Sequence, residues 1–212
     1  MSESSFEPNF IRSLRAVLFF PGFLMGKDCI RDCMNDQTLR AFFGNTLYYE
    51  FMPSVHLEKA ETEKIALHSV EYMLNDSSPM AEGMNQAVQA FRGAIDILET
   101  YLADQGEWPK NIVLSLAAQA FVLAGLRREE DRYTLLRNGC TVPVELDSEL
   151  ASRFSHLSAD MPAEDLSYAF LADVTLWGED IRRIGGLEEY LTRMIEQIQI
   201  RGFGNVIASL TE

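Results

Sequence analysis

The sequence predicts an all-α protein with one multi-helix domain over residues 1–212 and at most one small β-hairpin near residues 133–144. Apolar residues recur every three or four positions along most of the chain, which is the spacing of an amphipathic helix. Residues that start and end helices bracket these stretches. With 212 residues, 47% of them hydrophobic, the chain is long enough for one large core, and a second full domain is not expected.

Five helices are predicted in the N-terminal half. Pro8 lies in the first turn of the first helix, which Pro21 and Gly22 are expected to end. Asp36 caps the third helix, which Pro53 ends. The other three are expected over residues 27–34, 61–74 and 79–103, the last as a single long helix.

The C-terminal half is expected to contain the central core helix. Residues 112–126 are apolar almost all round and follow Pro109, which is typical of a helix start. Asn138-Gly139 favours a tight hairpin turn between residues 133–136 and 140–142, which Pro143 limits to an edge feature. Gly202-Phe203-Gly204 is interpreted as a helix end, and three further helices are expected over residues 147–157, 162–176 and 186–201.

Charge and composition disfavour several classes of function. The chain has 18 basic and 32 acidic residues and a formal charge of -14, which repels nucleic acids and anionic lipid surfaces. No apolar run is long enough for a membrane span, and the N-terminus lacks the basic start of a secretory signal. A cytoplasmic protein with no nucleic-acid or membrane partner is therefore expected.

The spacing of cysteines, histidines and glycines indicates no metal or cofactor site. Cys29 and Cys33 lie four apart on a predicted helix, which is typical of buried packing, and Cys140 is remote from them. The three histidines are scattered, so none is expected to bind a metal. No glycine-rich turn joins a strand to a helix, so no dinucleotide site is predicted in this chain.

Two arginines near the N-terminus are the first candidates for binding. Arg12 and Arg15 lie three apart on an apolar helix and share one face. Simple surface placement is one interpretation, and anion binding by the guanidinium pair is the other.

Four segments carry a family resemblance. In order and spacing they are similar to the C-terminal helical domain of the long-chain polyol dehydrogenases, the family of mannitol dehydrogenase and tagaturonate reductase (altronate oxidoreductase), and most of all to the tagaturonate reductase branch. The segments are Phe23–Asp36, Tyr49-Glu50-Phe51-Met52-Pro53, Trp108–Ala118, and Leu176–Ile181 with Ile184–Leu187.

The resemblance implies the fold of the family's helical domain but neither its NAD-binding domain nor its catalytic residues. Family members carry an N-terminal NAD-binding Rossmann domain, which we do not expect in this chain, so NAD would be needed only if a separate Rossmann-domain protein were its partner. The family's catalytic Lys, Asn and His fall at Phe10, Arg15 and Leu18, and its second polar pair falls near Glu82 and Gly83; none of these matches. We expect no catalytic residues and no hydride transfer by this chain alone.

Three functions remain open. The first is a catalytically incomplete relative that binds a sugar acid or a protein; a pocket lined by Arg12, Arg15 and Arg92 would favour a sugar acid. The second is the helical half of a split or truncated NAD-dependent tagaturonate reductase. The third is a structural or self-associating protein, which an exposed apolar patch would favour, at Phe19, Phe20, Phe23 and Leu24.

Overall fold

The computed structural model describes residues 3–129, 132–137 and 140–211, most of which are helical. The helical elements are α1 (Glu3–Leu24), α2 (Ile30–Asn35), α3 (Gln37–Asn45), the π-helix η1 (Thr46–Phe51), the 3₁₀-helix η2 (Met52–Ser54), α4 (Lys59–Asn75), α5 (Met80–Ala90), α6 (Arg92–Gln105), α7 (Lys110–Ala124), α8 (Ser148–Arg153), α9 (Ala163–Leu171), α10 (Val174–Trp177), the 3₁₀-helix η3 (Ile181–Arg183), α11 (Leu187–Arg201) and α12 (Phe203–Thr211). The strands are β1 (Leu126–Glu129), β2 (Arg132–Arg137) and β3 (Cys140–Val144). The predicted fold class is confirmed.

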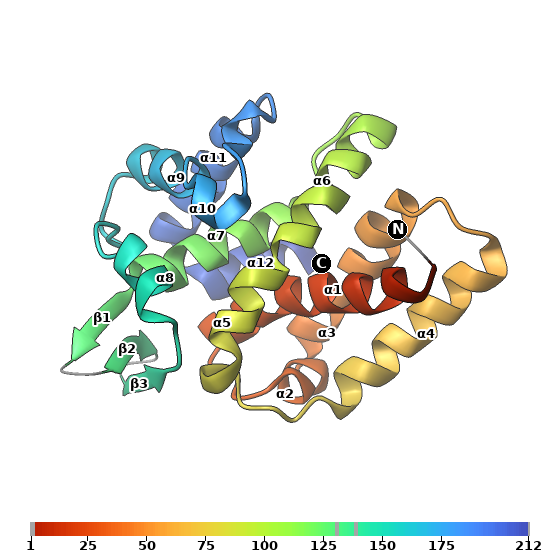
Figure 1. Ribbon diagram of the computed structural model, residues 1–212, viewed down its shortest axis with the longest axis horizontal. Helices are drawn as coiled ribbons and strands as arrows, with labels where there is room; N and C mark the ends of the chain where they lie inside the picture. Colours follow the sequence, from red (N-terminus) through yellow and green to blue (C-terminus); the bar gives the residue numbers. More distant parts are fainter. Residues whose placement is uncertain (1–2, 130–131, 138–139, 212) are drawn as a thin grey trace.

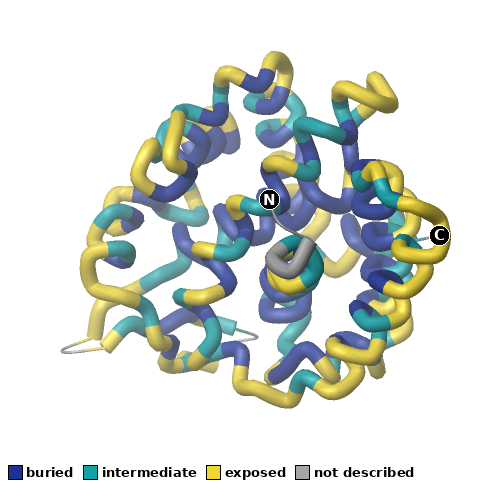
Figure 2. Tube along the Cα trace, turned by 45° about the vertical axis from the view of Figure 1, so that its right-hand side comes forward, coloured by how far each residue is buried: buried dark blue, intermediate teal, exposed yellow. Residues whose placement is uncertain are grey.

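Two helices form the centre of the molecule (Figure 1). Helix α1 packs against α7, and α5 and α6 also lie against it. Residues Asn111–Ala120 of α7 are all buried, so the predicted central core helix is confirmed. Burial on every side explains why this helix carries apolar residues all round rather than on one stripe. Figure 2 shows that buried positions lie toward the inside of the molecule and that exposed positions lie at its outer surface.

Helix α1 continues through Pro21 to Leu24, so the prediction that Pro21 ends it is wrong. A proline has no N–H and leaves the carbonyl four residues earlier, here that of Val17, without its helical donor. The Ser115 hydroxyl of α7 donates to the Val17 oxygen at 2.6 Å instead. The tertiary contact supplies the bond that the proline removes, and the helix continues.

The predicted long helix over residues 79–103 is two helices, because the chain tightens at Phe91. The N–H of Ala94 donates to the Phe91 carbonyl, a tighter 3₁₀-type bond, and α6 begins at Arg92. The Phe91 side chain is fully buried against Phe20 and Trp177. Core packing at the joint therefore replaces the straight helix that the sequence pattern indicated.

A small antiparallel sheet lies at one end of the molecule in the order β1-β2-β3 (Figure 1). The predicted hairpin is confirmed by β2 and β3, where Leu135 is opposite Val142, while its Asn138-Gly139 turn lies outside the described residues. Strand β1, which was not predicted, extends the hairpin by one strand. Helix α7 accordingly ends at Ala124.

Several helix ends differ from the prediction. Asp36 caps α3 as expected, since its carboxylate accepts from the Leu39 N–H at 3.1 Å, but regular helix gives way to η1 at Thr46. The predicted helix over 162–176 is divided between α9 and α10, because Asp173 caps a new helix start. Gly202 ends α11 with a positive φ of 78°, and α12, which was not predicted, follows at once. No helix in the described part of the chain is long and apolar enough to cross a membrane.

Candidate functional site

A cleft of about 1080 Å³ lies between α1, the end of α4, α5 and α6. Arg12, Arg15 and Arg92 all line it. The residues come from two helices that are far apart in the sequence, so the fold brings the three predicted binding residues to one surface.

Arg15 is the most firmly held of the three. Its Nε donates to Asp76 Oδ2 at 2.6 Å, and the two side chains are only 12% and 6% exposed. The guanidinium carbon lies 5.6 Å from the centre of the Phe19 ring, which adds a cation–π contact. Arg15 therefore lies at the cleft as a largely buried member of an ion pair.

Arg12 and Arg92 are exposed, and they differ in how they are held. Arg12 lies one turn before Arg15 on α1. Arg92 reaches across to the end of α10, where its Nη2 donates to the Leu176 carbonyl at 3.2 Å. A Cβ added to Gly178 would lie 2.8 Å from Arg92 Nη2, so this glycine leaves the room that the guanidinium occupies.

The cleft is mixed in charge rather than basic. Four carboxyl groups line it together with the three guanidinium groups, those of Asp76, Glu82, Asp96 and Glu145. Desolvation, together with the carboxylates of Glu99 and Glu179, raises the pKa of Asp96. Carboxamides add neutral donors and acceptors, from Asn9, Gln86 and Gln89. The lining can therefore both donate to an anion and accept from hydroxyl groups.

The close crossing of α1 and α6 at the cleft depends on Gly93. A Cβ at this position would lie 2.2 Å from Ser13 Oγ, which is closer than any real contact. Ser13 turns its hydroxyl to the Asn9 carbonyl of its own helix at 2.9 Å. Glycine at position 93 thus lets the helix that carries Arg92 approach the helix that carries Arg12 and Arg15.

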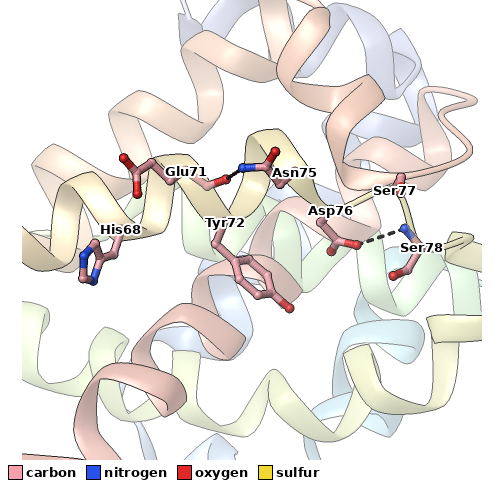
Figure 3. A pocket seen from close by; sticks show the side chains of 7 residues that line it. All are labelled: His68, Glu71, Tyr72, Asn75, Asp76, Ser77 and Ser78. Carbon is pink, nitrogen blue, oxygen red and sulfur yellow. Dashed lines mark hydrogen bonds between the residues drawn. The ribbon is translucent and has the colours of Figure 1, made fainter.

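A second, shallower hollow of about 440 Å³ borders the cleft at the end of α4 (Figure 3). Tyr72, Asp76 and Ser78 line both hollows. Asp76 Oδ1 accepts from the Ser78 N–H at 3.1 Å, as Figure 3 shows, while Oδ2 holds Arg15. Asp76 was not predicted as a site residue, because nothing in the local sequence indicates a partner 61 positions away.

The three positions that the resemblance assigned to the family's catalytic Lys, Asn and His hold Phe10, Arg15 and Leu18. Phe10 and Leu18 are 4% and 1% exposed and belong to the core. Arg15 is the one polar residue of the three, and it is paired with Asp76. At the second position, Glu82 and Gly83 line the cleft.

The other candidates lie outside the cleft or inside the core. Among the described residues, no group of three or more His, Cys, Asp or Glu side chains could hold a metal ion. Phe19, Phe20 and Phe23 are at most 2% exposed, because their rings pack against one another within the core, so they form none of the exposed apolar patch that would favour self-association. Only Leu24 of that group is partly exposed.

Sequence comparison finds altronate oxidoreductases that are similar to this chain along nearly its whole length. An altronate oxidoreductase of Bacteroides thetaiotaomicron is 25% identical over 184 residues, and one of Klebsiella pneumoniae is 27% identical over 197. These alignments cover 85% and 89% of this chain. The chain is a relative of the altronate oxidoreductases. It matches their C-terminal part and spans 36% and 38% of the length of these two relatives.

Solved structures agree with this relationship at the level of the fold. Mannitol 2-dehydrogenase of Pseudomonas fluorescens, in a ternary complex with NAD and D-mannitol, superposes with a TM-score of 0.71 over 95% of this chain at 16% identity. A D-sorbitol dehydrogenase superposes with a TM-score of 0.61 over 94%. Each match covers 39% of the larger protein. No protein-family model matches the chain.

The segments that resemble the altronate oxidoreductase relatives build the scaffold. Glu50 is buried and accepts from the N–H groups of Asn111 and Ile112 at 2.7 and 2.9 Å, so it caps the central helix. Trp108 stacks on Tyr190, and the Trp177 indole donates to the Phe170 carbonyl. These contacts hold helices together that are far apart in the sequence.

Proposed function

We propose that this chain binds a sugar acid in the cleft and does not itself transfer hydride. The binding half of the proposal rests on one observation: Arg12, Arg15 and Arg92 line a single cleft together with carboxyl and carboxamide groups. Guanidinium groups suit a carboxylate, and carboxyl and carboxamide oxygens accept from hydroxyl groups. A sugar acid carries both kinds of group. The relation to altronate oxidoreductases, named for such an acid, supports the same class of ligand.

The catalytic half of the proposal rests on Phe10 and Leu18. Oxidation of a hydroxyl group to a carbonyl needs a base that takes the hydroxyl proton and groups that orient the oxygen. In the family that the chain resembles, this helix supplies a Lys, an Asn and a His for these tasks, whereas here the outer two positions hold buried apolar side chains. Loss of such groups lowers the rate by orders of magnitude. We further propose that the chain alone holds no NAD.

Thermal-shift measurements test the binding. A ligand that binds only the folded state raises the melting temperature. We expect tagaturonate and altronate to raise the Tm and NADH to leave it unchanged, with mannitol and fructose as neutral comparisons. The variant Arg12→Ala should reduce the shift, whereas Arg193→Ala, which removes an exposed arginine from α11, should keep it. No shift with any of the five compounds would contradict the proposal and favour a role in protein binding.

The second candidate is the helical half of an NAD-dependent oxidoreductase whose nucleotide-binding domain is a separate chain. The observation that favours it is the 36% to 38% of the relatives' length that this chain spans. Mixing the chain with the separately produced NAD-binding domain of an altronate oxidoreductase tests it directly. Oxidation of NADH that depends on tagaturonate and on both proteins would establish this candidate in place of the first.

A further inference from the structure

In the described parts of the chain, the guanidinium group of Arg15 uses only its Nε in a hydrogen bond within the protein, and its two Nη atoms remain free to bind a ligand. Nε is committed to Asp76 Oδ2. Asp76 is itself fixed, because its second carboxylate oxygen accepts from the Ser78 N–H and its carbonyl accepts from the Arg31 N–H at 2.8 Å. A guanidinium fixed in this way loses little conformational entropy when it binds a ligand.

The two terminal nitrogens of Arg15 lie beside a residue without a side chain. A Cβ on Gly83 of α5 would lie 3.7 Å from Nη2 and 3.9 Å from Nη1, so both nitrogens lie next to Gly83 at the cleft wall. Within the part of the chain that the structure describes, neither Nη atom has a hydrogen-bond partner, and neither is sealed from solvent. Two parallel N–H donors on one planar group match the two oxygens of a carboxylate.

The surroundings favour a ligand with one negative charge. Arg12 adds a second guanidinium group one turn away, but Glu82 and Glu145 also line the cleft, and the whole chain carries a charge of -14. A phosphate ester carries nearly two negative charges, so these carboxylates and the net charge would repel it about twice as strongly as a monocarboxylate. The hydroxyl groups of a monocarboxylate can instead donate to the carboxylates of the lining.

We propose that Arg15, positioned by Asp76 and left accessible by Gly83, is the residue that binds the carboxylate of the ligand and selects sugar acids over neutral polyols and sugar phosphates. This inference rests on the proposed function and adds to it a specificity-determining residue. Asp76 acts as a positioning residue, because it touches Arg15 rather than the ligand.

Calorimetric titration with altronate, mannitol and sorbitol 6-phosphate tests the inference. The wild-type chain should bind altronate more tightly than the other two. The variant Arg15→Lys keeps the charge and an ion pair with Asp76 but lacks the paired donors. It should lose about tenfold to a hundredfold in affinity for altronate, the range expected for one charge-assisted hydrogen bond, with no change for mannitol.

A second variant keeps the Arg15–Asp76 pair intact. Gly83→Leu should cover the Nη atoms, and it should still fold because the added Cβ makes only ordinary contacts and leucine favours a helix more than glycine does. Gly44→Leu is the matched control, since a Cβ there meets nothing within 4 Å and Gly44 lies on α3, outside the cleft. Gly83→Leu should abolish the preference for altronate, and Gly44→Leu should retain it.

The outcomes separate the two proposals. Equal affinity of the wild type for altronate and mannitol, or unchanged altronate binding in Arg15→Lys and Gly83→Leu, would overturn the role of Arg15 and leave ligand binding in the cleft intact. Tighter binding of sorbitol 6-phosphate than of altronate would overturn the selection for a monocarboxylate. An absence of binding by all three compounds would overturn the proposed function and this inference together.

Discussion

Glu50 is a buried carboxylate that caps the central helix. It is 4% exposed, and burial raises its pKa to about 7, although the N–H groups of Asn111 and Ile112 act in the opposite direction. The folded chain therefore holds a proton on Glu50 between the ordinary value of 4.5 and about pH 7, whereas the unfolded chain has released it. The stabilisation of the folded state by this proton is fully present below about pH 4.5 and is lost as the pH rises through 7.

We predict that Glu50 makes the free energy of unfolding depend on pH. The contribution should fall by about 3 kcal/mol between pH 4.5 and 7, from the shift in pKa and its conversion to free energy. Glu50→Gln keeps one acceptor for the helix N–H groups but does not titrate. Urea unfolding of both proteins at several pH values isolates the effect as their difference. A difference that is constant with pH would show that Glu50 keeps an ordinary pKa.

The candidate site shows what spacing can and cannot predict for single residues. Arg12 and Arg15 were found because a helix places positions three apart on one face. Asp76 was not, because its partner Arg15 lies 61 positions earlier and only the fold brings them together. Gly83 carries no signal at all in the sequence, since its importance comes from the side chain it lacks beside Arg15.

At the scale of the helix, Pro21 and Ser115 act as a pair. The proline deprives the buried Val17 carbonyl of a donor, and the Ser115 hydroxyl supplies one. Local rules for proline predicted a helix end at this position, because they cannot include a donor from a helix almost a hundred residues away. The same limit applies at Phe91, where a stretch with continuous helical spacing is divided between α5 and α6 and the Phe91 ring packs against Phe20 and Trp177.

We predict that Ser115→Ala destabilises the chain by about 1 to 3 kcal/mol, because it leaves a buried carbonyl without a donor. Pro21→Ala restores the N–H that a helix normally provides. The double variant should therefore lose less than Ser115→Ala alone, provided that alanine at position 21 is tolerated in the single variant. Urea unfolding of the four proteins completes the cycle. Additive losses would show that the two residues do not share the Val17 carbonyl.

Over the whole molecule, the excess of acidic residues opposes the compact state. The sequence alone establishes this property, because the charge of -14 follows from composition and the fold has no means to bury so many carboxylates. Ion pairs such as those of Arg183 with Glu99 and Glu179 offset part of the repulsion at the surface. Exposed pairs of this kind contribute little each, so the excess charge should decide the response to salt.

We predict that NaCl stabilises the chain. Raising the salt from about 10 to 100 mM shortens the Debye length from about 30 to 10 Å, which screens long-range repulsion more than it weakens close ion pairs. A gain of about 1 kcal/mol would raise the Tm by roughly 2–4 °C for a chain of this size. Replacing the exposed residues Glu129 and Glu196 by lysine makes the net charge four units less negative and should reduce the rise in Tm with salt. A Tm that falls with NaCl in the wild type would mean that attraction within ion pairs outweighs the net charge.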